Sequence, residues 1–121
     1  MNGIEVTQMN ELLGHVLVEV VKNGEDEIVF HREDGRSVVM YHEQDCCENV
    51  RVEDIDGDLL DLVGSEILEA EFVTSRGDGS WDGDYQTWTF YKIGTAKGFV
   101  NIRWLGESNG YYSEEVNIRV D

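Results

Sequence analysis

Arginine residues placed inside apolar, strand-like segments are the feature of this sequence with the clearest chemical potential. The tripeptide Asn-Ile-Arg occurs at 101–103 and again at 117–119, and Arg51 stands between Val50 and Val52. The chain holds nine Lys and Arg against twenty-six Asp and Glu, so each cation is scarce. A guanidinium group donates paired hydrogen bonds to phosphate or carboxylate oxygens. These arginines are therefore candidates for holding an anionic ligand.

Ion pairs with neighbouring carboxylates are the alternative use of the same arginines. If the two Asn-Ile-Arg segments form a hairpin, Arg103 lies near Glu115 or Asn117, with Glu107 and Glu114 close by. Exposed pairs of this kind neutralise charge and contribute little to stability. From the residues alone, ligand binding and charge neutralisation both stay open.

Side-chain parity tests the register of that expected hairpin. A two-residue turn at Asn109-Gly110 sets Ile102 opposite Asn117, which mixes an apolar position with a polar one. A three-residue connection, in either of two positions, sets Ile102 opposite Val116 or Ile118 instead. Both connections place four polar residues on one sheet face: Asn101, Arg103, Asn117 and Arg119.

Alternating apolar residues and turn signals predict a mostly β, antiparallel protein. Segments 15–22, 26–33 and 36–42 are expected to form a three-stranded meander, because Asn23-Gly24 and Asp34-Gly35 favour tight turns. Further strands are expected at 48–55, 65–76, 86–93, 99–105 and 113–120. Short helices are expected at 7–13, capped by Thr7 and ended by Gly14, and within 57–64. The prediction is a single domain, residues 1–121, with an antiparallel sheet or partial barrel of about seven or eight strands and one or two short helices.

The net charge of −17 limits the possible partners. It repels nucleic-acid backbones and anionic membrane surfaces, so neither is expected as a partner. The first residues lack a secretory pattern, and no apolar run approaches the roughly 18 residues of a membrane span, which favours the cytoplasm. An acidic surface can also imitate DNA for a nuclease target, and the run of carboxylates at 53–58 is the segment suited to that role.

Metal, cofactor and catalytic signals are weak. The stretch 42–48 offers His, Cys and acidic groups without the spacing of a zinc site. The Asp-rich segments 54–58 and 78–89 lack the pattern of a calcium loop, and turn chemistry accounts for them. No nucleophile motif or acid and base pair is present, so we expect no enzyme, no cofactor and no metal. Among the aromatic residues, Trp88 is expected in the core, whereas Trp81, in a polar loop, is a candidate for stacking on a base.

Four segments carry a family resemblance: YHEQDCCENV, EDIDGDLLDLVGS, QTWTFYK and IRWLGESNGYYSEEV. Together they resemble small acidic bacteriophage proteins of the first anti-Thoeris family. The resemblance implies a sponge that binds a cyclic ADP-ribose isomer made by a bacterial defence enzyme, and in some members cyclic oligonucleotides. The signal is sequestered without cleavage in the cytoplasm of the infected host. Oligomers built from dimers are implied as well.

The resemblance also implies ligand-binding residues. Arg51 and Arg103 match the phosphate-binding arginines of the family, while Arg76, Trp81 and Gln86 lie where contacts to base and ribose are expected. Asn101 and Arg119 join this set because the predicted hairpin places them beside Arg103. One of the two Asn-Ile-Arg arginines then holds phosphate, and the other pairs with carboxylates or shapes an interface. The alternatives from other classes are a DNA-mimicking inhibitor of a restriction or CRISPR nuclease, and a structural adaptor without a small ligand.

Overall fold

Strands dominate the computed structural model, which describes residues 4–6, 9–42, 48–76, 85–108 and 116–121. Within these ranges the strands are β1 (Ile4–Val6), β2 (Leu17–Asn23), β3 (Glu27–Arg32), β4 (Ser37–Tyr41), β5 (Glu48–Asp56), β6 (Glu69–Arg76), β7 (Tyr85–Thr95), β8 (Gly98–Ser108) and β9 (Asn117–Val120). Two 3-10 turns, η1 (Met9–Leu12) and η2 (Leu59–Leu62), accompany them. The mostly β prediction is confirmed, and β1 is the strand that the sequence pattern did not indicate.

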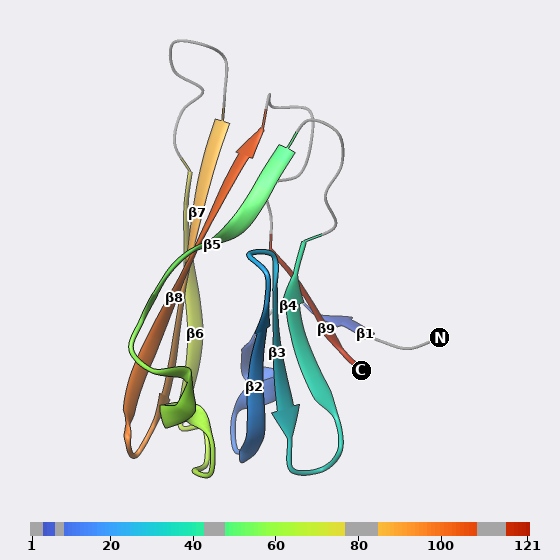
Figure 1. The fold of residues 1–121 in the computed structure, drawn as a ribbon, viewed down its shortest axis with the longest axis vertical. Coiled ribbons are helices and arrows are strands. Elements are labelled where there is room, and N and C mark those ends of the chain that lie inside the picture. The colour runs from blue at the N-terminus through green and yellow to red at the C-terminus, as the bar shows by residue number, and fades with distance from the viewer. Residues whose placement is uncertain (1–3, 7–8, 43–47, 77–84, 109–115) are drawn as a thin grey trace.

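The strands form two antiparallel sheets, which stand side by side in Figure 1. The first has the order β1-β9-β4-β3-β2, and its β2, β3 and β4 are the meander predicted from the two turn signals. The second has the order β5-β8-β7-β6 and contains the long β7–β8 hairpin. The split into two sheets goes beyond the single sheet or partial barrel that was expected.

A shared core joins the inner faces of the two sheets. Phe30 and Met40 from the first sheet, and Ile102 and Trp104 from the second, belong to one cluster of buried side chains. Trp104 Nε1 donates a hydrogen bond to Met40 Sδ over 2.8 Å, which gives the buried indole N–H a partner across the sandwich. The period-2 alternation of each strand sends its intervening residues to the outside.

The predicted hairpin between the two Asn-Ile-Arg segments is wrong. β8 is 11 residues long and pairs with β7 on one side and β5 on the other, so it offers no free edge to β9. β9 pairs instead with β4 and β1 in the other sheet. Asn101 and Arg103 therefore lie in a different sheet from Asn117 and Arg119.

The two 3-10 turns occupy the places where short helices were expected. Asp58 caps η2 by accepting a hydrogen bond from the Leu60 N–H over 2.9 Å, and Gly64 follows with a φ of 88°. Gly14, with a φ of 80°, follows η1 in the same way. Both glycines adopt the left-handed conformation that other residues disfavour. In the part of the chain that the structure describes, no helix is long and apolar enough to cross a membrane.

Candidate anion-binding face

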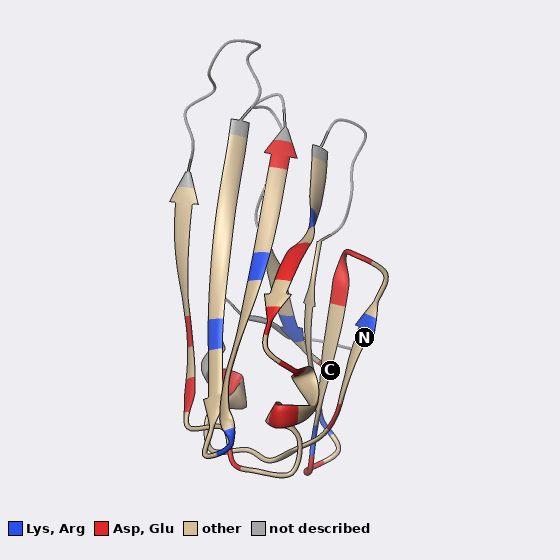
Figure 2. Cartoon of the chain, turned by 60° about the vertical axis from the view of Figure 1, so that its left-hand side comes forward, with Lys and Arg blue, Asp and Glu red and all other residues tan. Residues whose placement is uncertain are grey.

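One side of the β5-β8-β7-β6 sheet points away from the core, and we call it the outer face. Alternate residues of β7 and β8 define it, because their neighbours Thr89, Tyr91, Ile102 and Trp104 are buried on the opposite side. The outer face includes Arg51, Asp54, Val73, Gln86, Trp88, Phe90, Lys92, Asn101, Arg103, Leu105 and Glu107. Figure 2 turns this side of the molecule forward and shows a few separate blue Lys or Arg segments and red Asp or Glu segments on its otherwise tan strands.

Arg103 lies near the middle of the outer face, between Phe90 on β7 and Asp54 on β5. Its guanidinium lies 4.0 Å from the Asp54 carboxylate and 5.3 Å from the centre of the Trp88 ring. The side chain is 43% exposed, yet its Nε is buried and has no hydrogen-bond partner among the described residues. Arg103 is thus held by an aromatic ring and a distant carboxylate, with donor capacity left over.

Aromatic rings lie directly beside Arg103. Trp88 and Phe90 are stacked with centroids 6.4 Å apart, and Phe90 is 43% exposed. The prediction that Trp88 belongs to the core is therefore wrong: Trp88 is only partly buried and lies on the outer face. In a strand, Trp88 points to the opposite side from Tyr91 and Ile93, which are buried. This alternation was the signal in the sequence that could have placed Trp88 on the outer face.

Arg51 is more tightly engaged than Arg103. Its guanidinium lies 2.9 Å from Glu107 and 3.3 Å from Glu53, and its side chain is 24% exposed. The pairing of β5 with β8 shifts between Val52 and Asp54, so Glu53 is the extra residue of a bulge. The ion-pair interpretation is therefore confirmed for Arg51 in this structure. Its partner Glu107 is 56 positions away in the sequence.

Arg119 does not belong to the outer face. It lies in the other sheet, where its Nε donates to both Asp121 oxygens over 2.9 and 3.1 Å. The guanidinium also covers the Tyr41 ring at 4.7 Å. Its hydrogen bond with Asp121 raises the pKa of Arg119 above its ordinary value. Grouping Arg119 with Arg103 was wrong because it depended on the hairpin, and Arg119 pairs with a carboxylate instead.

The remaining predicted site residues divide into two groups. Gln86 and Asn101 are exposed on the outer face, opposite Glu107 and Lys92 respectively. Arg76 ends β6 opposite Thr87, but its side chain and the whole of Trp81 lie outside the described residues. The structure therefore places Arg51, Arg103, Gln86 and Asn101 on one face, with Gln86 opposite Glu107 at one end of this stretch of β8 and Asn101 at the other.

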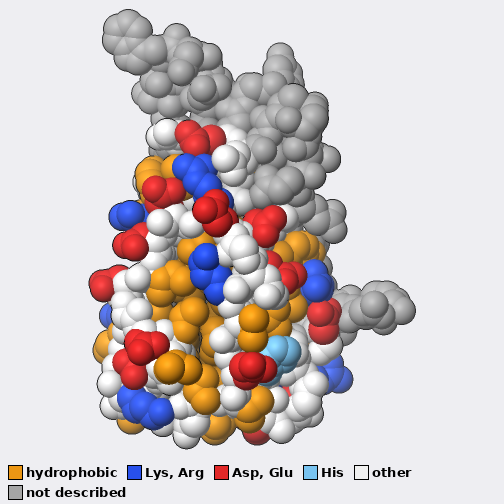
Figure 3. Space-filling view, in the orientation of Figure 1, with side chains coloured by type: hydrophobic (Ala, Val, Ile, Leu, Met, Phe, Trp, Pro, Cys, Tyr) orange, Lys and Arg blue, Asp and Glu red, His pale blue; other side chains and the backbone are white. Residues whose placement is uncertain are grey.

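Carboxylates of the segment 53–58 are partly used inside the protein. Glu53 contacts Arg51, Asp54 lies near Arg103, and Asp58 caps η2. Figure 3 shows red and blue side chains interspersed on the visible side of the molecule. These internal contacts reduce the number of carboxylates in this segment that are available to imitate phosphates.

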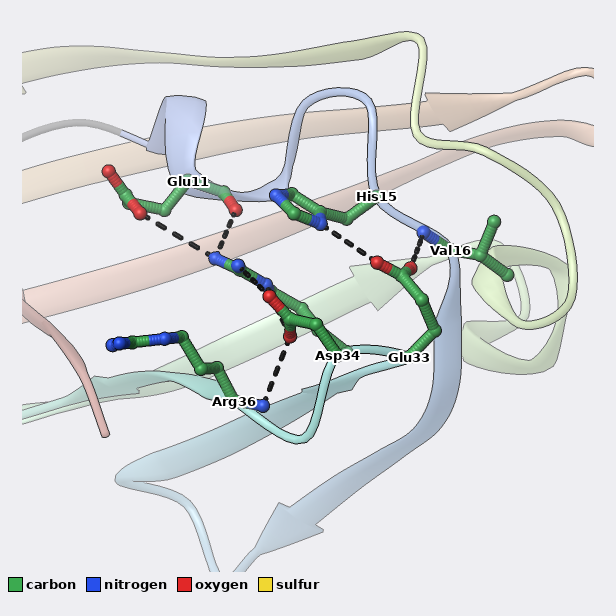
Figure 4. Close-up of polar contacts among 7 residues, drawn as sticks. Glu11, His15, Val16, Glu33, Asp34 and Arg36 are labelled. Carbon is green, nitrogen blue, oxygen red and sulfur yellow. Dashed lines mark hydrogen bonds and ion pairs between the residues drawn. The ribbon is translucent and has the colours of Figure 1, made fainter.

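A second polar cluster, which the sequence pattern did not indicate, lies around Arg32, whose partners Glu11 and Asp34 are labelled in Figure 4. Arg32 is 7% exposed and contacts the Asp34 carboxylate, the Glu11 carboxylate at 3.6 Å and the Glu11 carbonyl at 3.1 Å. Hydrogen bonds from Arg32 and from the Arg36 backbone N–H lower the pKa of Asp34 to about 2. We call these contacts the Arg32 cluster. It ties the β3–β4 turn to η1.

The residues His15, Glu33 and Asp34 have ligand atoms within 4.8 Å of one another. Their groups are engaged by the protein itself. His15 Nδ1 lies 2.9 Å from Glu33, the Val16 N–H donates to the same carboxylate, and Asp34 serves Arg32. The hydrogen bond with His15 lowers the pKa of Glu33. We therefore read this group as structural.

Most of the segments weighed for metals cannot be compared with the structure. His42 is buried, whereas residues 43–47 and 77–84 lie outside the described ranges. In the described segment 54–58, Asp58 is a cap and Asp54 faces Arg103.

Comparison with known proteins gives one finding. No curated protein and no solved structure matches the chain. The model of a family described as a domain of unknown function, DUF7448, matches residues 10–118. Since this match spans well over half of the 121 residues, the chain belongs to the DUF7448 family.

Proposed function

We propose that this protein binds a cyclic nucleotide immune signal, a cyclic ADP-ribose isomer, on the outer face and sequesters it without cleaving it. The observation that carries the proposal is Arg103, a partly exposed guanidinium with a loosely placed acid and an unpartnered buried Nε. The bacteriophage family resemblance supplies the ligand class and the setting, the cytoplasm of an infected host. Cyclic oligonucleotides and assembly into oligomers of dimers are parts of the same proposal.

Arg103 can exchange its present partner for a ligand at small cost. A separation of 4.0 Å is beyond hydrogen-bonding distance, and the Asp54 side chain is 60% exposed. Exposed pairs of this kind contribute about 0–1 kcal/mol. Hydrogen bonds between charged groups contribute ~1.5–3 kcal/mol, so a phosphate oxygen on Arg103 gains more than Asp54 loses.

The aromatic pair supplies a surface for the base or ribose of the same ligand. Trp88 already stacks against Arg103, and Phe90 presents 43% of its surface to solvent. Base stacking on an aromatic side chain contributes about 1–3 kcal/mol. Asn101, exposed two residues from Arg103 on the same face of β8, adds an amide donor and acceptor, while Gln86 lies farther along this face, opposite Glu107.

The negative charge of the whole protein does not prevent the binding of an anion here. At physiological salt, repulsion between exposed charges is screened beyond about 8 Å. Contacts with Arg103 act well inside that range. Sequestration requires binding alone, so the outer face needs no nucleophile or general base.

Calorimetry with cyclic ADP-ribose isomers tests the proposal. We expect binding by the wild type, recovery of intact ligand after heat denaturation, and an affinity about 100-fold lower in Arg103→Ala, corresponding to the loss of charged hydrogen bonds. Arg36→Ala is the matched control, since it removes the same charge from the exposed β3–β4 turn. Equal affinities in the two variants, or recovery of a cleaved ligand, contradict the proposal.

A further inference from the structure

We infer that Glu107 is a built-in competitor for Arg51, occupying the place that a ligand phosphate takes on that guanidinium. This inference rests on the proposed function of the outer face and adds an affinity-determining residue to it. The Arg51 terminal nitrogen lies 2.9 Å from Glu107 Oε1, and Arg51 Nε lies 3.3 Å from Glu53. Two of the three guanidinium nitrogens of Arg51 therefore already have a carboxylate beside them.

Strand register places Arg51 and Arg103 within reach of one ligand. Arg51 pairs with Leu105, which lies between Arg103 and Glu107 on the outer face of β8. Arg51 is therefore a diagonal neighbour of both residues, and diagonal neighbours in a sheet lie within reach of long side chains. A pyrophosphate bound to Arg103 contacts one guanidinium group. The guanidinium of Arg51 lies beside it and is paired with Glu107.

The two arginines differ in how firmly their carboxylates hold them. Arg51 and Glu107 are 24% and 38% exposed, whereas Arg103 and Asp54 are 43% and 60% exposed. The shorter and less exposed pair is less screened by solvent and is harder to open. Arg103 is thus the first contact of an incoming anion, and Arg51 joins only after Glu107 has moved aside.

After an anion displaces Glu107 from Arg51, the released carboxylate continues to weaken the binding of that anion. One carboxylate contact on Arg51 is exchanged for one phosphate contact, so the gain at Arg51 is small. The released carboxylate stays tethered to β8, two residues from Leu105 and close to the bound anion, where like charges repel. Removing the charge of Glu107 while keeping its shape should therefore strengthen anion binding.

The test uses inorganic pyrophosphate as the probe, measured by calorimetry on the full chain. We expect Glu107→Gln to bind pyrophosphate about tenfold more tightly than the wild type. Glu19→Gln is the matched control, because it removes one negative charge from β2 in the other sheet, where Glu19 is exposed. We expect no change of affinity in that control.

A double-mutant cycle identifies Arg51 as the source of the gain. In the Arg51→Ala background only the repulsion between Glu107 and the anion on Arg103 remains, so Glu107→Gln should raise the affinity by clearly less than in the wild-type background. Equal gains in Glu107→Gln and Glu19→Gln overturn the inference, as does a gain of the same size in the presence and absence of Arg51. Absence of pyrophosphate binding by Glu107→Gln at about 10 mM, where even a millimolar site fills, also overturns it.

The outcomes separate this inference from the proposed function. If cyclic ADP-ribose binding depends on Arg103 but Glu107→Gln does not bind pyrophosphate more tightly, the inference about Glu107 is wrong and the proposed function stands. A gain in pyrophosphate affinity without any cyclic ADP-ribose binding removes the proposed ligand and leaves the competitor role of Glu107 in place.

Discussion

Arg32 and Arg103 show how differently one protein can use the same side chain. Arg32 is 7% exposed and contacts two carboxylates and a main-chain carbonyl. Arg103 is 43% exposed, lies 4.0 Å from its acid and has a buried Nε without a partner among the described residues. Each guanidinium nitrogen of Arg32 donates a hydrogen bond, whereas the Nε of Arg103 has no partner among the described residues.

The difference teaches which cations in an acidic protein are available to a ligand. Proximity of an acid is not enough, because every described arginine that was predicted as a ligand contact has a carboxylate nearby. Two properties separate a structural arginine from one that is available to a ligand: whether its N–H donors have partners, and how exposed its side chain is. On this scale Arg51 is intermediate, since it is well paired but lies at the edge of the same face as Arg103.

The largest expected effect on folding stability is that of Arg32. Arg32→Ala removes the contacts between η1 and the β3–β4 turn and leaves Glu11 and Asp34 without their cation. We expect a loss of ~2 kcal/mol in the free energy of unfolding, measured by urea denaturation. Arg36→Ala, four residues away on the surface, should stay within about 0.5 kcal/mol of the wild type. Equal losses of stability in the two variants would show that the buried contacts of Arg32 contribute no more than an exposed arginine does.

Arg103→Ala should have a much smaller effect on stability. The substitution removes a stacking contact with Trp88 and a distant ion pair, and it also removes the unpartnered Nε. We expect a change below about 1 kcal/mol in urea denaturation, alongside the large loss of ligand binding proposed above. A stability loss as large as that of Arg32→Ala would show that Arg103 is a structural residue.

Acid should remove part of the contribution of the Arg32 cluster. Asp34 has a pKa of about 2 in the folded protein against an ordinary value of 3.8, so the unfolded chain binds the proton more tightly. Its stabilising contribution is present above pH ~4 and is lost as the pH falls toward about 2. Asp34→Asn should therefore be less stable than the wild type at neutral pH, and urea midpoints should converge toward pH 2. A gap that is independent of pH would contradict this assignment.

The smallest expected effect comes from a carboxylate with an unfavourable neighbour. A side-chain hydrogen bond with Glu69, together with repulsion from its charge, raises the pKa of Glu71, the next residue along the outer side of β6, while Lys92 lies 3.7 Å from Glu69. Ionised Glu71 is disfavoured in the folded state, so Glu71→Gln should raise the midpoint of thermal unfolding slightly at neutral pH. The gain should vanish below the ordinary carboxyl pKa of 4.5. A lower midpoint at neutral pH would indicate that Lys92 outweighs the repulsion.

Much of the local structure was readable from residue order. The alternation of Val50, Arg51 and Val52 correctly indicated the two faces of β5, and Ile102, Arg103 and Trp104 did the same for β8. The same alternation continued to Asp54 puts that residue on the face of Val50 and Val52, which is wrong, because the bulge at Glu53 moves Asp54 to the outer face. The turn signals at Asn23-Gly24 and Asp34-Gly35 correctly predicted the meander. Opposite directions of successive side chains are a property of each strand by itself, and so neighbours along the chain suffice to predict them.

The candidate site was predicted in part for the same reason. Arg51, Arg103, Gln86 and Asn101 share the outer face, whereas Arg119 was misplaced because its assignment required a specific pairing of two strands. The partners that decide how available each arginine is are distant in sequence. Glu107 lies 56 residues from Arg51, and Glu11 lies 21 residues from Arg32.

The sequence by itself thus determined a mostly β chain, its meander and the outward direction of Arg51 and Arg103. Only the tertiary structure decided that β8 lies between β5 and β7, that β9 belongs to the other sheet, and which carboxylate reaches which guanidinium. Alternation has a period of two residues and is set locally, whereas strand order results from competition among all apolar faces for one core. Arg51 meets Glu107 and Arg103 meets Trp88 because of that order.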